Sequence, residues 1–290
     1  MIYIRKILHS LSMIVVMAGT GFAAHAEGYR VETFVPGSVC HGVHGLAISP
    51  AGELFAGSVI GQTLYRVDET SGDVSVEIAA PQGMADDISF APDDTMAWTG
   101  YITGHIYARS PGGEVRQLAE GLPGINSLAY RSDGRLYATQ VFLADALYEI
   151  DPKGEAAPRQ IIADMGGLNG FEFGPDDKLY GPLWFKGQVV RVDVGSGDKT
   201  IVAQGFVMPE GMDMAPDGRL IVAEVGKARI VSVDPADGSI AVLADGLPIG
   251  APAAAGTPPT SLPTGIAVSR DGSIFVTSDI ENAILKLIPN

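Results

Sequence analysis

One short pattern occurs six times along the chain, and this repeat restricts the fold more than any other feature. Each copy, here called a cassette, has a variable first residue, usually followed by glycine, then a short apolar run and a turn whose central residue lies seven positions after the first. The first residues, here called the lead residues, are His44, Asp86, Asn126, Asn169, Glu210 and Thr264, and the turn residues are Ala51, Asp93, Asp133, Asp176, Asp217 and Asp271.

The spacing of the lead residues indicates the architecture. Successive lead residues are 42, 40, 43, 41 and 54 positions apart. A period near 40 to 45 residues is typical of propeller blades with four antiparallel strands each. No helical periodicity is sustained for three turns, and the 37 glycines and 19 prolines suit turns. The sequence therefore predicts an all-β fold, a six-bladed β-propeller with four-stranded blades.

The two ends of the chain indicate how the ring closes. The last cassette supplies only three strands, expected over 265–268, 273–277 and 283–288, while a spare strand is expected over 29–35, before the first cassette. If the N-terminal strand completes the last blade, no unpaired sheet edge remains at the junction. We therefore expect six blades, the last closed by the N-terminal strand. A seventh blade would need another cassette, which the sequence does not contain.

The first 26 residues have the pattern of a secretory signal. Arg5 and Lys6 precede an apolar stretch over 7–22, and small residues flank the end at Ala24 and Ala26. We interpret 1–26 as a cleaved signal peptide and 27–290 as a single propeller domain, exported to the periplasm or secreted. A retained membrane anchor is the alternative, which the polar residues interrupting the apolar stretch disfavour.

Charge limits the classes of partner. Without residues 1–26 the chain has 17 basic and 34 acidic residues, a net charge of −17. Such a chain repels nucleic acid and anionic membrane surfaces, and it suits a cation or a neutral small-molecule substrate. Its single cysteine, Cys40, cannot form an internal disulfide. We expect a monomer that binds neither nucleic acid nor, after signal cleavage, a membrane.

In a propeller the lead residues of all blades converge on one end of the central channel. Here they supply two carboxylates, two carboxamides, an imidazole and a hydroxyl, a set of donors that suits a hard divalent cation. Calcium is the first expectation, with magnesium, manganese or zinc as alternatives. The other interpretation is that these residues are polar only because the mouth of a channel is exposed to water.

Three cassettes resemble a known family. Ile125-Asn126-Ser127, Leu168-Asn169-Gly170-Phe171 and Pro209-Glu210-Gly211-Met212 are similar to motifs of the gluconolactonase and regucalcin family. The resemblance implies a six-bladed propeller that hydrolyses sugar lactones with one divalent metal in the channel. It implies that Asn169 binds the metal, that Asn126 lies beside the metal and substrate, and that Glu210 binds the metal and acts as acid or base.

Two positions depart from that family. His44 stands where the family usually has a metal-binding glutamate, which would favour zinc or weaken calcium binding, although Asp86 on the next blade could restore the charge. Gly124 stands where sugar-lactone members tend to carry an arginine. The scaffold of the family is therefore better supported by these residues than its substrate.

The residues and the resemblance together give a hypothesis for the site: an exported, metal-dependent hydrolase of a lactone or ester. Glu210, Asn169, Asn126 and His44 are the predicted metal ligands, and Glu210 and Asp86 are the predicted catalytic acids or bases. The predicted substrate-binding residues are Asn126, Tyr101, Gln140, Trp184 and Thr264. The alternative is a non-catalytic periplasmic propeller that holds a structural cation and binds a ligand or a protein.

Three further features complete the expectations. The long gap before the last cassette lies in 247–261, which is either a lid or wall at the channel mouth or an inert insertion. Glu172 and Asp213, each three positions after a lead residue, are expected to accept backbone hydrogen bonds. The Cys40, His41 and His44 run is a weaker alternative site for zinc or copper.

Overall fold

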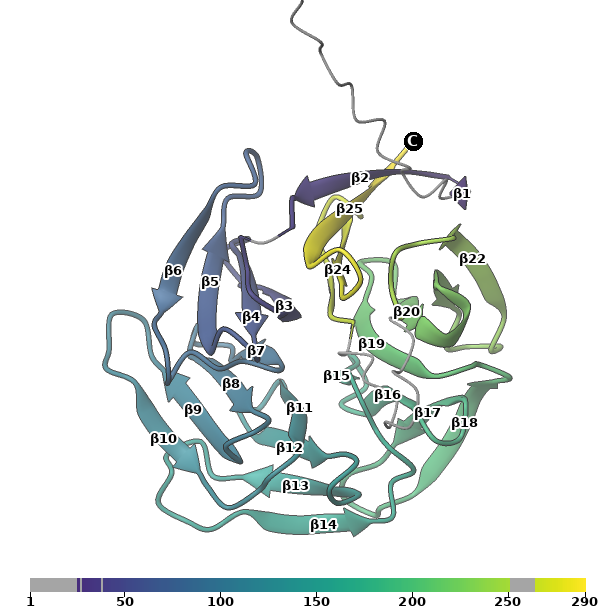
Figure 1. Cartoon of the computed structure of the whole chain (residues 1–290). Coiled ribbons are helices and arrows are strands. Elements are labelled where there is room, and N and C mark those ends of the chain that lie inside the picture. Colours follow the sequence, from purple (N-terminus) through teal and green to yellow (C-terminus); the bar gives the residue numbers. More distant parts are fainter. Residues whose placement is uncertain (1–24, 27, 38, 251–263) are drawn as a thin grey trace, which may run out of the picture.

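The protein is a ring of six β-sheets around a central axis (Figure 1). The computed structural model describes residues 25–26, 28–37, 39–250 and 264–290. Each blade has four antiparallel strands in sequence order, with two additions from the N-terminal segment: it supplies the outermost strand of the sixth blade, and a two-residue strand that extends the sheet of the fifth. The predicted six-bladed propeller with four-stranded blades is therefore confirmed.

The first three blades run from the inner to the outer strand as follows: β3 Val43–Ile48, β4 Leu54–Ser58, β5 Thr63–Val67 and β6 Val74–Ile78; β7 Ile88–Phe90, β8 Met96–Gly100, β9 His105–Arg109 and β10 Arg116–Ala119; β11 Ile125–Tyr130, β12 Leu136–Gln140, β13 Ala146–Ile150 and β14 Arg159–Ala163.

The last three blades are β15 Glu172–Phe173, β16 Leu179–Leu183, β17 Gln188–Val192 and β18 Lys199–Gln204; β19 Pro209–Met214, β20 Leu220–Glu224, β21 Arg229–Val233 and β22 Ile240–Asp245, with the short helix η1 Val225–Lys227; and β23 Ile266–Val268, β24 Ile274–Ser278, β25 Ala283–Pro289 and β2 Tyr29–Val35.

The ring closes between the two ends of the chain, as predicted. Strand β2 pairs antiparallel with β25 over most of its length. Val35 is 1% exposed and joins Phe275 and Ile284 in the apolar cluster between blades six and one. A two-residue strand, β1 His25–Ala26, also pairs with β22. These two residues belong to the segment predicted as a signal peptide; its residues 1–24 lie outside the described residues.

The hydrophobic core consists of six separate clusters, one between each pair of neighbouring blades. Each blade is apolar on both faces because each face packs against a neighbour. In β20, for example, Ile221 packs toward blade six whereas Val222 packs toward blade four. The cluster at the closing junction is therefore equivalent to the other five.

In five of the six cassettes the turn is stabilised by the side chain of its aspartate, whereas in the first, which has Ala51, Ser49 Oγ accepts the N–H of Glu53 at 3.1 Å. Asp133 Oδ1 accepts the N–H of Arg135 at 3.2 Å, and Asp217 Oδ1 accepts that of Arg219 at 3.1 Å. Asp93, Asp176 and Asp271 make the same bond two residues on. An aspartate that holds its own backbone in this way favours a tight turn. The repeated turn residues therefore fix the far end of each inner strand, opposite the lead residues.

Glycine after a lead residue lets the inner strands approach one another at the axis. A Cβ on Gly211 would lie 1.9 Å from the carbonyl oxygen of Thr264 in the next blade. A Cβ on Gly265 would lie 2.2 Å from the carbonyl oxygen of His44. Both obstacles are backbone atoms that cannot rotate away. The diameter of the channel at this end is therefore set by glycine contacts between blades.

The described part of segment 247–261 belongs to the core. Leu247 and Ile249 are each 2% exposed and join the cluster between blades five and six. Gly250 N–H donates to Asp279 Oδ1 at 2.8 Å. The rest of this segment, 251–261, to which the alternatives of a lid and an inert insertion apply, lies outside the described residues. Within the described residues no helix is long and apolar enough to cross a membrane.

We expect Gly211→Ala to destabilise the ring by about 3 kcal/mol, the upper range for overpacking, because its new methyl group meets backbone on the next blade. Gly195→Ala is the matched control, since Gly195 lies in an exposed turn and its Cβ would meet only the Asp193 side chain at 3.2 Å. Urea unfolding of both variants measures the difference. Equal loss of stability in the two would contradict the close approach of the inner strands.

Candidate functional site

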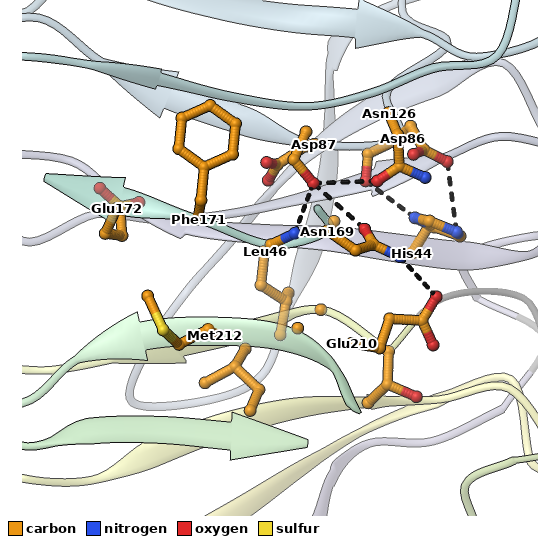
Figure 2. Close-up of a pocket in the computed structure, with 17 residues that line it drawn as sticks. His44, Leu46, Asp86, Asp87, Asn126, Asn169, Phe171, Glu172, Glu210 and Met212 are labelled. Atoms are coloured by element: carbon orange, nitrogen blue, oxygen red, sulfur yellow. Dashed lines mark hydrogen bonds and ion pairs between the residues drawn. The ribbon is translucent and has the colours of Figure 1, made fainter. Parts of the chain in front are cut away.

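The six lead residues converge at one end of the channel, as the cassette register predicts. Each lies within the first residues of an inner strand or just before it, and each side chain is at most 4% exposed. Together they line a single cavity. Figure 2 shows five of them turned toward one another from five blades: His44, Asp86, Asn126, Asn169 and Glu210.

The cavity is small and its wall holds no lysine or arginine. Its volume is about 30 Å³, room for one or two water molecules or a single ion. Four acidic residues line it, Asp86, Asp87, Glu172 and Glu210, and no lysine or arginine is among the described lining residues. No three or more His, Cys, Asp or Glu side chains in the described part of the chain form a group that could hold a metal ion by themselves. Any cation site here must include the carboxamides.

A hydrogen-bond chain fixes the two carboxamides. Ser127 Oγ lies 2.9 Å from Asn126 Oδ1 and 3.2 Å from Asn169 Oδ1, and it accepts the N–H of Gly170 at 2.7 Å. Asn169 Nδ2 donates to Glu210 Oε1 at 3.2 Å. This series of hydrogen bonds therefore runs from blade three to blade five, and Glu210 Oε2 takes no part in it.

His44 and Asp86 form a second pair. His44 Nδ1 lies 2.8 Å from the backbone carbonyl oxygen of Asp86, so Nδ1 carries the proton. Burial lowers the pKa of His44 to about 4, against the smaller effect of that hydrogen bond, and the ring is neutral at pH 7. Its Nε2 lone pair faces Asp86 Oδ1 at 3.2 Å. His44 Nε2 and Asp86 Oδ1 are both acceptors, so their close approach requires a proton or a cation between or beside them.

Five of the six lead residues retain a buried polar atom that has no hydrogen-bond partner in the described structure. Buried polar atoms are nearly always bonded, and leaving one unpaired costs about 1 to 3 kcal/mol. The five atoms are His44 Nε2, Asp86 Oδ2, Asn126 Nδ2, Glu210 Oε2 and Thr264 Oγ1. The cavity wall therefore contains five polar atoms without a hydrogen-bond partner among the described residues.

The carboxyl groups of this wall are hard to ionise. Burial raises the pKa of Asp86 well above its usual value, and the neighbouring charges of Asp87 and Glu210 add to the effect. Burial likewise raises the pKa of Glu210, with a further increase from Asp279. Hydrogen bonds to Glu210 from Thr264 and Asn169 oppose this rise. Both groups favour a bound proton or a bound cation.

Three more carboxyl groups lie deeper along the channel: Asp87, Glu172 and Asp213. Glu172 lies between the mouth cavity and a wider one of about 330 Å³ that Asp213 also lines. Asp213 accepts the N–H groups of Met214 and Val268, both at 2.6 Å, as expected for this position. Burial raises the pKa of Asp87 to about 7 and that of Asp213 to about 6. Burial and the charges of Asp213 and Asp87 raise the pKa of Glu172 well above its usual value.

Three predicted substrate-binding residues lie outside the cavity wall. Gln140 uses both ends of its amide: Nε2 donates to the Pro123 carbonyl at 2.9 Å, and Oε1 accepts from Tyr148 at 2.8 Å. Tyr101 is half-buried; burial and the charges of Asp86 and Glu210 raise its pKa. Trp184 is 9% exposed and packs edge-on against another aromatic ring, Phe142. The remaining two, Asn126 and Thr264, line the cavity.

The sequence offered a signal for two residues that we had not predicted. Ser127 and Asp87 occupy the position after the lead residue, where the other four cassettes have glycine. Asp87 Oδ2 accepts the Leu128 N–H of the next blade at 3.1 Å. Cys40, by contrast, is buried in the cluster between blades six and one, and burial raises its pKa to about 11.

Solved structures share the fold over two thirds to nine tenths of this chain. A gluconolactonase from Xanthomonas campestris is 16% identical with a TM-score of 0.69, over 90% of each chain. Virginiamycin B lyase from Staphylococcus aureus is 15% identical with a TM-score of 0.62, over 90% of this chain and 99% of that one. A chain of a nidogen/laminin complex is 17% identical with a TM-score of 0.61, over 68% of this chain and 78% of that one. No family model and no curated protein matches the sequence.

The buried acids predict a pH-dependent effect of Glu172→Gln. The pKa of Glu172 is higher folded than unfolded, so its contribution to stability is full below about pH 4.5 and is lost as pH rises through the folded pKa. Gln imitates the protonated form at every pH. We therefore expect the variant to melt a few degrees higher than the parent at pH 8, with a smaller difference at pH 5.

Glu114→Gln, at an exposed position, is the control and should shift neither value. Differential scanning calorimetry at both pH values gives the comparison. A lower melting temperature of Glu172→Gln at pH 8 would mean that the ionised carboxylate is stabilising, contrary to this account.

Proposed function

We propose that the protein is a metal-dependent hydrolase of a lactone or ester, with the reaction at the mouth of the channel. The unpartnered polar atoms of the lead residues carry this proposal. They surround a space of about one ion, include two buried carboxyl groups and have no lysine or arginine beside them in the wall. A divalent cation would satisfy these groups and compensate their charge.

The donor set fits such a cation. Glu210 Oε2 and either Asp86 Oδ2 or the Nε2 lone pair of His44 are available as ligands. Asn169, held between Ser127 and Glu210, would contribute its carboxamide oxygen. Asn126 directs Nδ2 at the cavity, and rotation of the carboxamide would direct Oδ1 there while Nδ2 donates to Ser127. When bound, the cation supplies a Lewis acid for an ester carbonyl. Oxygen donors favour calcium or magnesium, and His44 adds manganese and zinc to the set.

The protein side chains supply acid and base groups. Glu210 has one oxygen held by Asn169 and the other exposed to the cavity, so it can accept a proton from an attacking water. Asp86 lies beside a neutral His44 and can hold a proton against its Nε2. Burial raises the pKa of both groups well above their usual values, which favours their holding a proton. Glu210 is assigned as the base and Asp86 as the second acid or base.

The fold neighbours and the N-terminal segment add to the proposal. One neighbour is described as a gluconolactonase important in glucose secondary metabolic pathways, and its chain matches this one over 90% of each length. The pattern of residues 1–26 supports export to the periplasm or secretion. We further propose that the protein is a monomer and that its binding partner is a small-molecule substrate.

Glu210→Gln tests the function. It removes a base and a charged ligand while keeping the size and the acceptor for Asn169, so we expect kcat for lactone hydrolysis to fall at least about 100-fold. Addition of calcium should raise the melting temperature of the parent protein, and this shift should shrink in the variant. Glu114→Gln is the control and should keep both properties.

A panel of lactones and aryl esters, assayed after EDTA treatment and with calcium, magnesium, manganese or zinc restored, provides the measurement. Turnover that is equal in EDTA and in every metal would contradict the proposal. A metal-dependent melting shift without turnover on any substrate would instead favour the non-catalytic binding or scaffold protein, with the cation as a structural element.

A further inference from the structure

The turn between the second and third strands carries an exposed apolar side chain in five of the six blades. In the described structure these are Ile60, Ile102, Phe142, Phe185 and Ile280, with exposures of 61%, 60%, 48%, 53% and 42%. In blade five the turn has Gly226, and Val207, 43% exposed, fills its place. These turns lie at the end of the blades where the inner strands begin, so they surround the mouth of the polar cavity.

The apolar side chains gather most densely over blades three and four. The ring of Phe142 lies 5.7 Å from that of Trp184 and 5.5 Å from that of Phe185, both edge-on. Leu143, 67% exposed, follows Phe142. We call Phe142, Leu143, Trp184 and Phe185 the aromatic ledge. Edge-on aromatic contacts stabilise the arrangement and leave ring faces open to a ligand.

Phe142 adopts a backbone conformation that is unfavourable for its residue type. Its φ is +69°, in the left-handed region that bulky residues rarely enter. The side chain held there is half exposed, so burial of the ring does not fully offset the strain. Strained residues concentrate at binding sites. The conformation is a second indication, independent of exposure, that this ring serves a ligand.

The aromatic ledge is joined directly to the cavity. The backbone N–H of Trp184 donates to the backbone carbonyl of Gly167 at 2.8 Å, and the backbone N–H of Val141 donates to that of Gly124 at 3.1 Å. Gly124 and Gly167 lie two residues before Asn126 and Asn169, a distance of at most about 7 Å along the chain. A Cβ on Gly124 would lie 3.0 Å from Leu143 Cβ, and one on Gly167 would lie 2.7 Å from the Phe185 ring. The ledge therefore begins within one small-molecule length of the cavity.

The polar groups on this side are already bonded within the protein. Both ends of the Gln140 amide are engaged, and Asp145 accepts the N–H groups of Gly166 and Gly167 at 2.8 and 3.0 Å. Each oxygen of Asp145, and each end of the Gln140 amide, therefore already has a partner within the protein. The cavity itself, at about 30 Å³, admits a carbonyl group at most, so the body of a substrate must lie on the rim.

We propose that the aromatic ledge binds an alkyl or aryl substituent of the substrate, so that the protein acts on apolar lactones or esters in preference to polyhydroxylated sugar lactones. This rests on the proposed hydrolase function and names its substrate class. The ester group lies at the mouth of the polar cavity, while the substituent lies across Phe142 and Phe185.

The test compares kcat/KM for γ-butyrolactone, γ-hexalactone, γ-nonalactone and glucono-1,5-lactone. We expect kcat/KM to rise about threefold for each added methylene that reaches the ledge, and glucono-1,5-lactone to be the poorest substrate. In the double variant Phe142→Asn, Phe185→Ser the rise per methylene should fall toward one, because Asn tolerates the left-handed backbone but provides no apolar surface. Ile201→Ser, at an exposed outer-strand position, is the control and should retain the rise.

Binding of 2-heptylcyclopentanone, which has a ring and a chain but no ester bond, separates the two proposals. Trp184 reports it by fluorescence, since Trp98, the other tryptophan, is fully buried. Binding at least tenfold tighter than that of cyclopentanone, lost in the double variant, supports the ledge even if no lactone is hydrolysed, a result that would overturn only the hydrolase. Hydrolysis with no dependence on chain length, or a preference for glucono-1,5-lactone, would overturn the ledge and keep the hydrolase. Absence of both binding and hydrolysis would overturn both.

Discussion

The close approach of the six inner strands at the channel mouth is the constraint on which the site depends. Apolar clusters hold neighbouring blades together over most of their faces, whereas at the channel axis the inner strands meet through glycine and single side-chain bonds. At Gly211 and Gly265 there is no room for a side chain between the inner strands of neighbouring blades. Each of the six interfaces also has a side-chain bond along the channel, made by His44, Asp87, Ser127, Asn169, Asp213 and Thr277. The ring brings residues as far apart in sequence as His44 and Thr264 to the wall of one cavity.

Electrostatics then determines what the cavity can hold. The wall contains buried carboxyl groups and a neutral imidazole, and the fold places no lysine or arginine among them. Asp87, Glu172 and Asp213 extend the negative region further along the axis. A protein that concentrates acids in this way sacrifices stability at neutral pH unless protons or cations compensate. The apolar rim above this acidic channel divides the surface into a reacting centre and a surface for the rest of a substrate.

The sequence predicted the parts of this structure that follow from periodicity. Six cassettes gave six blades, the spare strand at Tyr29–Val35 gave the closing pair, and the register of the lead residues gave their convergence. It could not predict where side chains point. Gln140 lies at the correct end of its strand, yet its amide is bonded to Pro123 and Tyr148. For Ser127 and Asp87 the only indication in the sequence was the absence of glycine after two lead residues. The aromatic ledge depends on the left-handed backbone of Phe142, which no sequence pattern predicts.

The central claim is that the converging lead residues form one cation site. The most direct measurement is an anomalous difference map from crystals of the parent protein grown with manganese. The account predicts a single strong peak on the channel axis, enclosed by Glu210, Asn169, Asn126 and His44 or Asp86, and its loss in crystals of Glu210→Gln. A map with no peak in that cavity, while the same crystals bind manganese elsewhere, would contradict it.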